Sequence, residues 1–337
     1  MLIRSVLDCR PDQPKYMCCT LLLVASWLRH VAGTAKLEII VLGHPPAALT
    51  GFFDNVGVQW QITDADPALD FFGTGNTLLG AQQHGTDDRI LLVDNDVYFR
   101  ADIRELSDIP NTRMAGARAG NVRVRPEQWA EIRKALGLAP LNQPWTIIRS
   151  QVAALRDPDA PLQQDPLTYV NGGVLLLPKG DTFVQTWRAH IIRIADHFRD
   201  HPLKSAAVVA SNMAGLATAI GDHGDFEWLS DGMNYRHRML LLNELPLEQI
   251  KMLHMTGHPK TQETLPVQGY VSAHVAQYWN SRVLMDLRSL EAAHGARAYA
   301  TAMANVQAVM QEMQSTIGEY NLDQVMQGAL SERGVTP

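Results

Sequence analysis

Residues 90–99 have the sequence ILLVDNDVYF, which joins the most continuous apolar strand of the chain to a pair of aspartates. The run Ile90-Leu91-Leu92-Val93 contains no polar residue, and such runs are typical of strands covered on both faces of a sheet. Asp94-Asn95-Asp96 follows directly, and a second apolar run occupies residues 97–99. The stretch predicts a central strand that ends in two carboxylates.

The segments before this strand alternate between short apolar runs and helix-like ones. We expect strands over residues 2–7, 37–42 and 56–62, with a long helix over 16–31 and a short one over 77–83. Short buried strands that alternate with helices are typical of βαβ units. The fold class predicted is therefore α/β, with a mostly parallel central sheet flanked by helices.

After residue 110 the alternation continues with longer connections. We expect strands over 114–117 and 169–177 and helices over 126–136 and 181–198. Residues 140–168 are rich in Pro, Gln and Asp, which indicates a long connection or a lid.

The tail is helical from about residue 283, so we divide the chain into a main domain of residues 1–280 and a helical C-terminal extension of residues 281–337. One apolar stripe repeats there at intervals of three and four residues. This spacing predicts that the stripe packs on the main domain; the alternative is a homodimer contact through the C-terminal helices. The stripe consists of Met303, Val306, Met310, Met313, Ile317 and Tyr320.

Composition excludes several classes of protein. The chain has 337 residues, 46 % of them hydrophobic and 19 % charged, which is typical of a globular protein and not of a disordered one. A net charge of −6 without a basic run argues against a nucleic-acid partner. Three cysteines (Cys9, Cys18 and Cys19) form no disulfide framework, and the longest apolar run is too short to span a membrane. We therefore expect a cytoplasmic location.

The aspartate pair predicts a metal site. Residues i and i+2 of an extended chain face the same side, so Asp94 and Asp96 can reach one cation. The carboxyl end of a central strand is where open α/β sheets bind ligands, and such oxygen ligands suit Mg²⁺ or Mn²⁺. Asp-x-Asp also begins at Asp64 and at Asp157, where the context indicates turns. An Asx turn that closes the strand is the alternative for the pair at residue 94.

Two classes of enzyme place Asp-x-Asp after such a strand. In one class the carboxylates hold a metal on the diphosphate of a nucleotide-sugar. In the other, the haloacid-dehalogenase-like phosphohydrolases, the first Asp is the nucleophile. That second class requires Thr or Val where this chain has Tyr98, and its motif normally lies near the start of the fold.

Two later segments carry polar and flexible residues at a strand end or after a helix. Asn171, Gly172 and Gly173 open an apolar strand, where small residues let a ligand approach the backbone; a bulge is the alternative. His254 lies in the sequence HMTGHPK, which ends at Lys260. A His joins two carboxylates well on Mn²⁺, and Lys can meet a phosphate, although a core or surface His is the alternative.

Together these motifs resemble a family. The order strand–Asp-x-Asp, Tyr-x-Asn-x-Gly-Val-Leu-Leu, then His-x-x-Gly-x-x-Lys looks like the glycogenin-like glycosyltransferases, which include the bacterial lipopolysaccharide galactosyltransferases. The resemblance covers about residues 1–262. It implies a GT-A, Rossmann-like fold and a metal-dependent hexosyltransferase that uses a UDP-sugar donor and Mn²⁺ (or Mg²⁺), with retention at the anomeric carbon. The acceptor, whether glycan, lipid, protein or small molecule, is left open.

The resemblance also assigns residues. Asp94, Asp96 and His254 match the metal ligands. The residues that match the binding site for the nucleotide-sugar are Asp8 and Tyr16 at the uridine, Asn76 at the donor sugar, Asn95 within the motif, Asn171 and Gly172 at the sugar and acceptor, and Gly257 and Lys260 at the diphosphate. Asn234 matches the asparagine of a family turn.

The sequence departs from the family at one catalytic feature. An Asp-Gln pair is expected near residues 205–215, where this chain has Ser211-Asn212-Met213. Asn212 and Asp165 are our candidates for the polar group beneath an oxocarbenium-like sugar. Without that pair, a non-catalytic nucleotide-sugar-binding protein is the alternative function.

Overall fold

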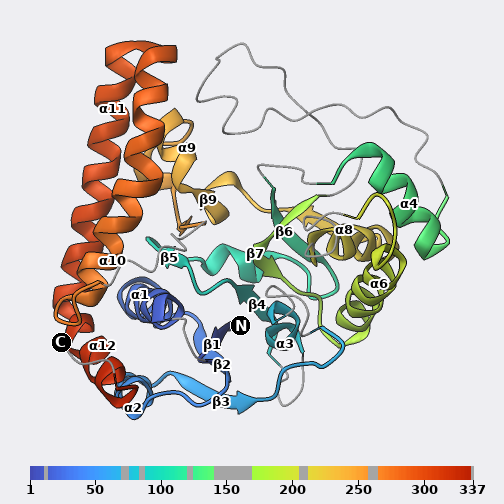
Figure 1. The fold of residues 1–337 in the computed structure, drawn as a ribbon, viewed down its shortest axis with the longest axis horizontal. Helices are drawn as coiled ribbons and strands as arrows, with labels where there is room; N and C mark the ends of the chain where they lie inside the picture. Colours follow the sequence, from blue (N-terminus) through green and yellow to red (C-terminus); the bar gives the residue numbers. More distant parts are fainter. Residues whose placement is uncertain are drawn as a thin grey trace.

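The chain forms two β-sheets with helices around them and a helical region along one side (Figure 1). The computed structural model describes residues 1–10, 14–69, 76–82, 88–119, 124–139, 169–204, 212–256 and 265–334. The predicted fold class is confirmed: a mostly parallel central sheet is flanked by helices, and the C-terminal region is helical. No described helix is both long enough and apolar enough to cross a membrane.

The large sheet has seven strands in the order β3-β2-β1-β4-β7-β6-β8. Neighbours are parallel except for the pairs that β7 makes with β4 and β6, which are antiparallel. The predicted central strand β4 is buried at all four positions. The strands are β1 Leu2–Asp8, β2 Lys36–Leu42, β3 Gln59–Thr63, β4 Ile90–Val93, β6 Met114–Arg118, β7 Val170–Leu176 and β8 Phe226–Trp228.

One prediction in this sheet is wrong by three residues. The strand expected from residue 56 begins at Gln59, because Gly57 has a φ of +74° that ends helix α2 in a turn. A residue in the left-handed region cannot extend a strand.

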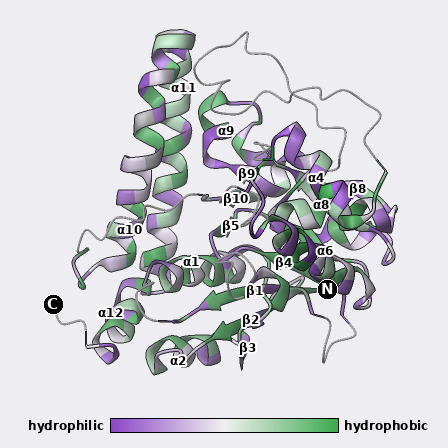
Figure 2. Cartoon of the chain, turned by 45° about the vertical axis from the view of Figure 1, so that its right-hand side comes forward, coloured by the Kyte–Doolittle hydropathy of each residue, from purple (hydrophilic) through white to green (hydrophobic). Residues whose placement is uncertain are grey.

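Helices cover both faces of the large sheet, as the alternation predicts. Helices α1 and α2 bury their apolar residues on one face, and α3, α6 and α8 do so on the other (Figure 1). Figure 2 shows the hydrophobic residues concentrated on α1 and on the strands beneath it. The helices are α1 Pro14–His30, α2 Ala47–Asn55, α3 Thr77–Ala81, α4 Pro126–Leu136, which packs on α6, then α6 Thr182–Phe198 and α8 Asn212–His223.

A second sheet of three short strands begins directly after the aspartates. Strand β5 (Val97–Phe99) pairs antiparallel with β10 (Met252–His254), which pairs parallel with β9 (Tyr235–Arg236). The pairing brings His254 opposite Val97, next to Asp96. The short elements around it are η1 Arg104–Asp108, η2 Asp231–Asn234, α9 His237–Leu242 and η3 Leu247–Gln249.

The C-terminal helices pack on α1, α2 and α9. The predicted apolar stripe is buried within the chain: Val306, Met313 and Ile317 join the main core, so the first of its two interpretations is confirmed. A break at Gly295, where φ is +83°, divides α11 into two limbs joined at the top of Figure 1. The helices are α10 Tyr270–Tyr278, a π-helix at Trp279–Val283, α11 Leu284–Glu319 and α12 Leu322–Glu332.

The last described turn also contacts the first strands. Both carboxylate oxygens of Glu332 accept hydrogen bonds from the backbone N–H groups of Ala47 and Ala48 at the start of α2, at 2.6 and 2.8 Å. The guanidinium of Arg333 donates to the carbonyl of Cys9, directly after β1. The C-terminal helix is thereby attached beside the carboxyl end of the first strand.

Candidate functional site

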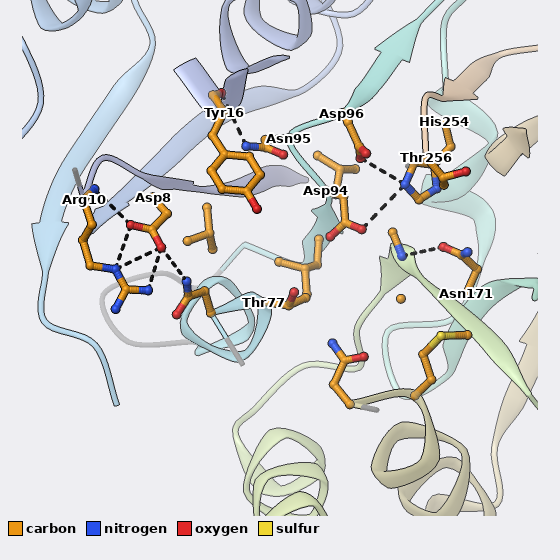
Figure 3. A pocket seen from close by; sticks show the side chains of 18 residues that line it. Asp8, Arg10, Tyr16, Thr77, Asp94, Asn95, Asp96, Asn171, His254 and Thr256 are labelled. Atoms are coloured by element: carbon orange, nitrogen blue, oxygen red, sulfur yellow. Dashed lines mark hydrogen bonds and ion pairs between the residues drawn. The ribbon is translucent and has the colours of Figure 1, made fainter. Parts of the chain in front are cut away.

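A pocket of about 440 Å³ opens at the carboxyl ends of β1 and β4 and beside the start of β7 (Figure 3). Its volume lies within the ~300–1,000 Å³ range of small-molecule sites. Asp8 and Arg10 lie at one end, and Asn212 and Met213 line it at the start of α8. The aspartate pair and His254 lie between them, so the predicted motifs converge on one cavity.

Asp94, Asp96 and His254 form a compact cluster. Nε2 of His254 lies 3.0 Å from Oδ1 of Asp96 and 3.7 Å from Oδ2 of Asp94. The chain between the aspartates is a turn, closed by a hydrogen bond from the Val97 N–H to the Asp94 carbonyl. The extended geometry that we used to predict convergence is therefore wrong, yet the turn directs both carboxylates toward the same nitrogen.

Backbone hydrogen bonds hold this turn between the two sheets. The Asp94 N–H donates to the carbonyl of Gly173 on β7, and the Met255 N–H donates to the carbonyl of Asp96. The turn is thus attached to the large sheet on one side and to the end of β10 on the other. Both attachments use main-chain groups of the turn.

A chain of buried amides sets the tautomer of His254. The Gly173 N–H donates to Asn171 Oδ1 at 2.8 Å, which fixes that atom as an oxygen. The same oxygen accepts from Asn234 Nδ2 at 3.2 Å, so Asn234 Oδ1 is the atom that faces Nδ1 of His254 at 2.8 Å. Nδ1 must therefore carry the proton, and in the neutral ring Nε2 presents a lone pair to the two carboxylates.

This arrangement requires a cation. A lone pair and two carboxylates that converge within about 4 Å repel one another unless a proton or a metal ion lies between them. Two carboxylate oxygens with one imidazole nitrogen form a donor set that suits Mn²⁺ or Mg²⁺ and other divalent ions. The bond from Nδ1 to Asn234 is the outer contact that orients a metal-binding histidine. The three residues fit a divalent metal site.

The electrostatics of Asp94 agree with this interpretation. Burial, followed by the charge of Asp96, raises the pKa of Asp94 to about 6, while His254 acts in the opposite direction. The protein surrounds the carboxylate, but 39 % of the side chain still faces the pocket, so water moderates this rise. A bound divalent ion would remove the repulsion between the two carboxylates.

Gly173 is required for a reason that the sequence analysis missed. We expected the glycine pair to admit a ligand, but a Cβ at Gly173 would overlap the ring of His254 and the side chain of Asn171. At Gly172 the nearest atom to such a Cβ is Asn212 Nδ2, at 4.0 Å. Gly173 therefore makes room for the histidine, and Gly172 is the glycine that faces the pocket.

The residues expected at the uridine gather at the opposite end of the pocket. Asp8 accepts hydrogen bonds from Asn76 Nδ2 at 3.1 Å and from the guanidinium of Arg10 at 2.6 to 3.0 Å. Asn95 donates to the carbonyl of Tyr16 at 3.4 Å, and both residues line the pocket. This end offers a carboxylate, amides and a partly exposed cation, which can form hydrogen bonds with a polar ligand.

The structure brings together most of the predicted site residues. Asn171, Gly172 and Asn212 line the pocket with the residues above. Asp165, Gly257 and Lys260 lie outside the described residues. The sequence analysis gave no role to Arg10, whose signal is its position two residues after the carboxyl end of β1.

A second cluster of metal-ligand residues is less suited to an ion. Glu131 Oε2 lies 3.1 Å from Nε2 of His197 and 3.6 Å from Nε2 of His201, where α4 packs on α6. However, Nδ1 of His201 accepts a hydrogen bond from the Leu203 N–H at 3.1 Å. The proton of the neutral ring is then on Nε2, so that nitrogen donates toward Glu131 and has no free lone pair for a metal.

Among the comparisons with known proteins, only the one with solved structures finds similar proteins. No family model matches the sequence, and no curated protein is significantly similar to it. An active-site mutant of LgtC aligns with 84 % of this chain and 100 % of its own, at 14 % identity and a TM-score of 0.46. The glycosyltransferase GlyE of Streptococcus pneumoniae TIGR4 aligns with 86 % of this chain and 63 % of its own, at 16 % identity and a TM-score of 0.43.

Mouse xyloside xylosyltransferase 1 aligns with 78 % of this chain and 99 % of its own, at 14 % identity and a TM-score of 0.41. The neighbours include glycosyltransferases. Because the identities and TM-scores are this low, we infer the chemistry of this chain from its own residues.

Proposed function

We propose that this chain is a metal-dependent glycosyltransferase that moves a hexose from a UDP-sugar to an acceptor. The observation that supports it best is the buried amide chain that turns the lone pair of His254 toward Asp94 and Asp96. This metal site lies in a pocket whose other end, at Asp8 and Asn76, is suited to the polar groups of a nucleoside. The resemblance to the glycogenin-like enzymes adds the donor class, Mn²⁺ and retention to this proposal.

In the proposed mechanism each group of residues has a separate task. Asp94, Asp96 and His254 would hold a divalent ion, which when bound acts as a Lewis acid on the departing diphosphate. Asp8 and Asn76 would position the nucleoside, and Lys260 would add a positive charge at the phosphates. Asn171, Gly172 and Asn212 would line the sugar, where Asn212 can accept or donate a hydrogen bond. Positioning of this kind supplies a large part of many enzymatic rate enhancements.

A non-catalytic nucleotide-sugar-binding protein is the second candidate. Among the described residues that line the pocket, the carboxylates are Asp8, Asp94 and Asp96. The first is paired with Arg10 and the other two face His254, so none of the three is placed to stabilise a sugar cation. Asn212 has no negative charge with which to do so. A pocket of this kind can bind a donor without transferring its sugar.

Calorimetric titration of UDP, with and without Mn²⁺, tests the proposal. We expect binding that requires Mn²⁺ and is lost in Asp96→Asn, which keeps the shape of the side chain but removes its charge. Asp64→Asn is the matched control, because Asp64 is the exposed first residue of another Asp-x-Asp, follows the edge strand β3 and does not line the pocket. Absence of Mn²⁺-dependent UDP binding by the native chain would overturn the proposal. Release of free hexose from UDP-hexose by the native chain would distinguish the enzyme from the binding protein.

A further inference from the structure

The edge strand β8 carries an exposed aromatic side chain. Trp228 is 39 % exposed, and among the described residues only one other large apolar side chain, Ile62, is exposed to a similar degree. Phe226 contacts Trp228 edge-on, with ring centroids 4.9 Å apart, and the guanidinium carbon of Arg118 lies 5.0 Å from the Trp228 ring centroid. Tryptophan that remains exposed beside a binding pocket often marks a recognition surface.

The strand register places Arg118 at the pocket edge of the sheet. Arg118 is the partner of Val170, whose neighbour Asn171 lines the pocket. Trp228 is the partner of Gly116 on β6, so it lies two strand spacings, about 10 Å, from β7. Strand β8 follows α8 in the chain, and the first residues of that helix line the pocket. Arg118 therefore lies beside the start of β7, where Asn171 and Gly172 line the pocket, and Trp228 lies against Arg118.

A break in the strand register accounts for the direction of Arg118. The pairing of β6 with β7 shifts between Gly116 and Arg118, and such bulges re-aim side chains at the edges of sites. Arg118 is exposed and forms no ion pair with any carboxylate among the described residues. Its planar guanidinium is held over the indole, and its N–H groups can still donate to a ligand. In a chain of net charge −6, this cation is a notable feature of the site's surroundings.

We propose that Trp228 and Arg118 form the acceptor subsite and that its occupant is a sugar ring. The proposal rests on the proposed function, because an acceptor must reach the donor sugar from the side of the pocket away from the nucleoside. An indole offers a flat apolar surface to the C–H groups of a sugar, and a guanidinium donates to its hydroxyl or acidic groups. The two side chains lie against each other, and Arg118 is the strand partner of Val170, the neighbour of the pocket residue Asn171.

A protein partner that adds a strand to this edge is the competing occupant. Strand β8 has only three residues, so it offers few unpaired main-chain groups to another strand. Strand addition draws its affinity from such main-chain hydrogen bonds. The side chains are thus a better basis for recognition at this edge than the backbone is.

Binding of the labelled native chain to an array of immobilised oligosaccharides tests the proposal, in the presence and absence of UDP and Mn²⁺. We expect at least one saccharide to bind the native chain. Its affinity for Trp228→Ala should be at least about tenfold lower, and Trp228→Phe, which keeps an aromatic face, should retain part of the affinity. Ile62→Ala is the matched control, because Ile62 is also an exposed large apolar side chain but lies on β3 at the opposite edge of the sheet.

Two results would overturn the proposal. Either no saccharide binds the native chain, or Trp228→Ala binds the same saccharide with the same affinity as the native chain. Sedimentation of the same variants tests the competing occupant for the case in which the added strand comes from a second copy of this chain. In that case Trp228→Ala would abolish self-association instead. Titration with UDP and Mn²⁺ separates this proposal from the proposed function. If Trp228→Ala still binds UDP, its defect lies in acceptor binding. If the native chain binds no UDP, the proposed donor function is wrong.

Discussion

Asn234 determines which nitrogen of His254 faces the aspartates. Its Oδ1 accepts the Nδ1–H proton, and Asn234→Ala removes that acceptor, so the ring loses both its orientation and its preferred tautomer. We expect Mn²⁺ affinity to fall about 10- to 100-fold, the usual effect of losing an outer contact of a metal ligand. Titration monitored by the paramagnetic resonance of free Mn²⁺ measures it. Asn305→Ala, which removes an amide that binds Asn243 away from the pocket, is the control. Unchanged affinity in Asn234→Ala would refute this role.

Protons would compete with a divalent ion for Asp94. Because the pKa of Asp94 is raised to about 6, a bound ion must displace a proton below that pH. We expect the Mn²⁺ affinity to fall about tenfold per pH unit below about pH 6 and to level off above it. The same Mn²⁺ titration, repeated across this pH range, measures the slope.

The raised pKa of Asp94 also makes the stability of the metal-free chain depend on pH. A raised folded-state pKa means that the charge of Asp94 lowers the free energy of unfolding above about pH 6, and that this cost disappears as the pH falls. Asp94→Asn should therefore raise the melting temperature with chelator present by more at about pH 7.5 than at about pH 5, because the cost vanishes only below the unfolded-state pKa. Equal effects at both pH values would show that Asp94 is not responsible.

At the scale of elements, β7 and β10 meet where Gly173 faces His254. A Cβ at Gly173 would overlap the imidazole, so Gly173→Ala must displace the histidine or the strand. We expect a loss of about 1–3 kcal/mol in the free energy of unfolding, together with loss of Mn²⁺ binding. Gly172→Ala is the matched control, because its Cβ would have 4.0 Å to the nearest atom. Urea unfolding measures both variants, and equal stability would contradict this packing.

The sequence predicted the elements whose signal is local. The run at residues 90–93, the helix that begins at Pro14 and the stripe around Val306 each lie within one element, so their periodicity shows their burial. The second sheet was not predicted, because β9 and β10 have only two and three residues and their pairing depends on the rest of the fold. A strand of that length leaves no pattern to detect.

The site was predicted in its residue types but not in its connections. The three residues of the proposed metal site were identified from motifs, whereas the contact between Asn234 and Asn171 joins residues 63 positions apart. No local pattern shows such a pair. Likewise, the turn at Asp94 replaced an extended chain because main-chain bonds to Gly173 and Met255, formed only in the folded protein, hold it there.

At the scale of the whole molecule, the last helix supports the wall of the pocket. The guanidinium of Arg333 donates to the carbonyl of Cys9, which lies next to Asp8 at the end of the pocket proposed for the nucleoside. Arg333→Ala should weaken UDP binding about two- to tenfold, the effect of losing one hydrogen bond, without changing Mn²⁺ affinity. Calorimetry measures both. The control is Glu319→Ala, which removes a partly exposed ion pair with Arg29 at 3.7 Å. Weaker Mn²⁺ binding in Arg333→Ala would indicate a general loss of structure instead.

The turn after β4 connects the large sheet to the small one, whereas His254 lies in the small sheet alone. An ion held by all three residues would therefore form a reversible cross-link between the two sheets. Ligand binding to the folded state stabilises whatever it joins. Chelation should then speed amide hydrogen exchange in β5, β9 and β10 while leaving β1 and β4 protected, so the metal would govern the rigidity of half the pocket as well as its chemistry.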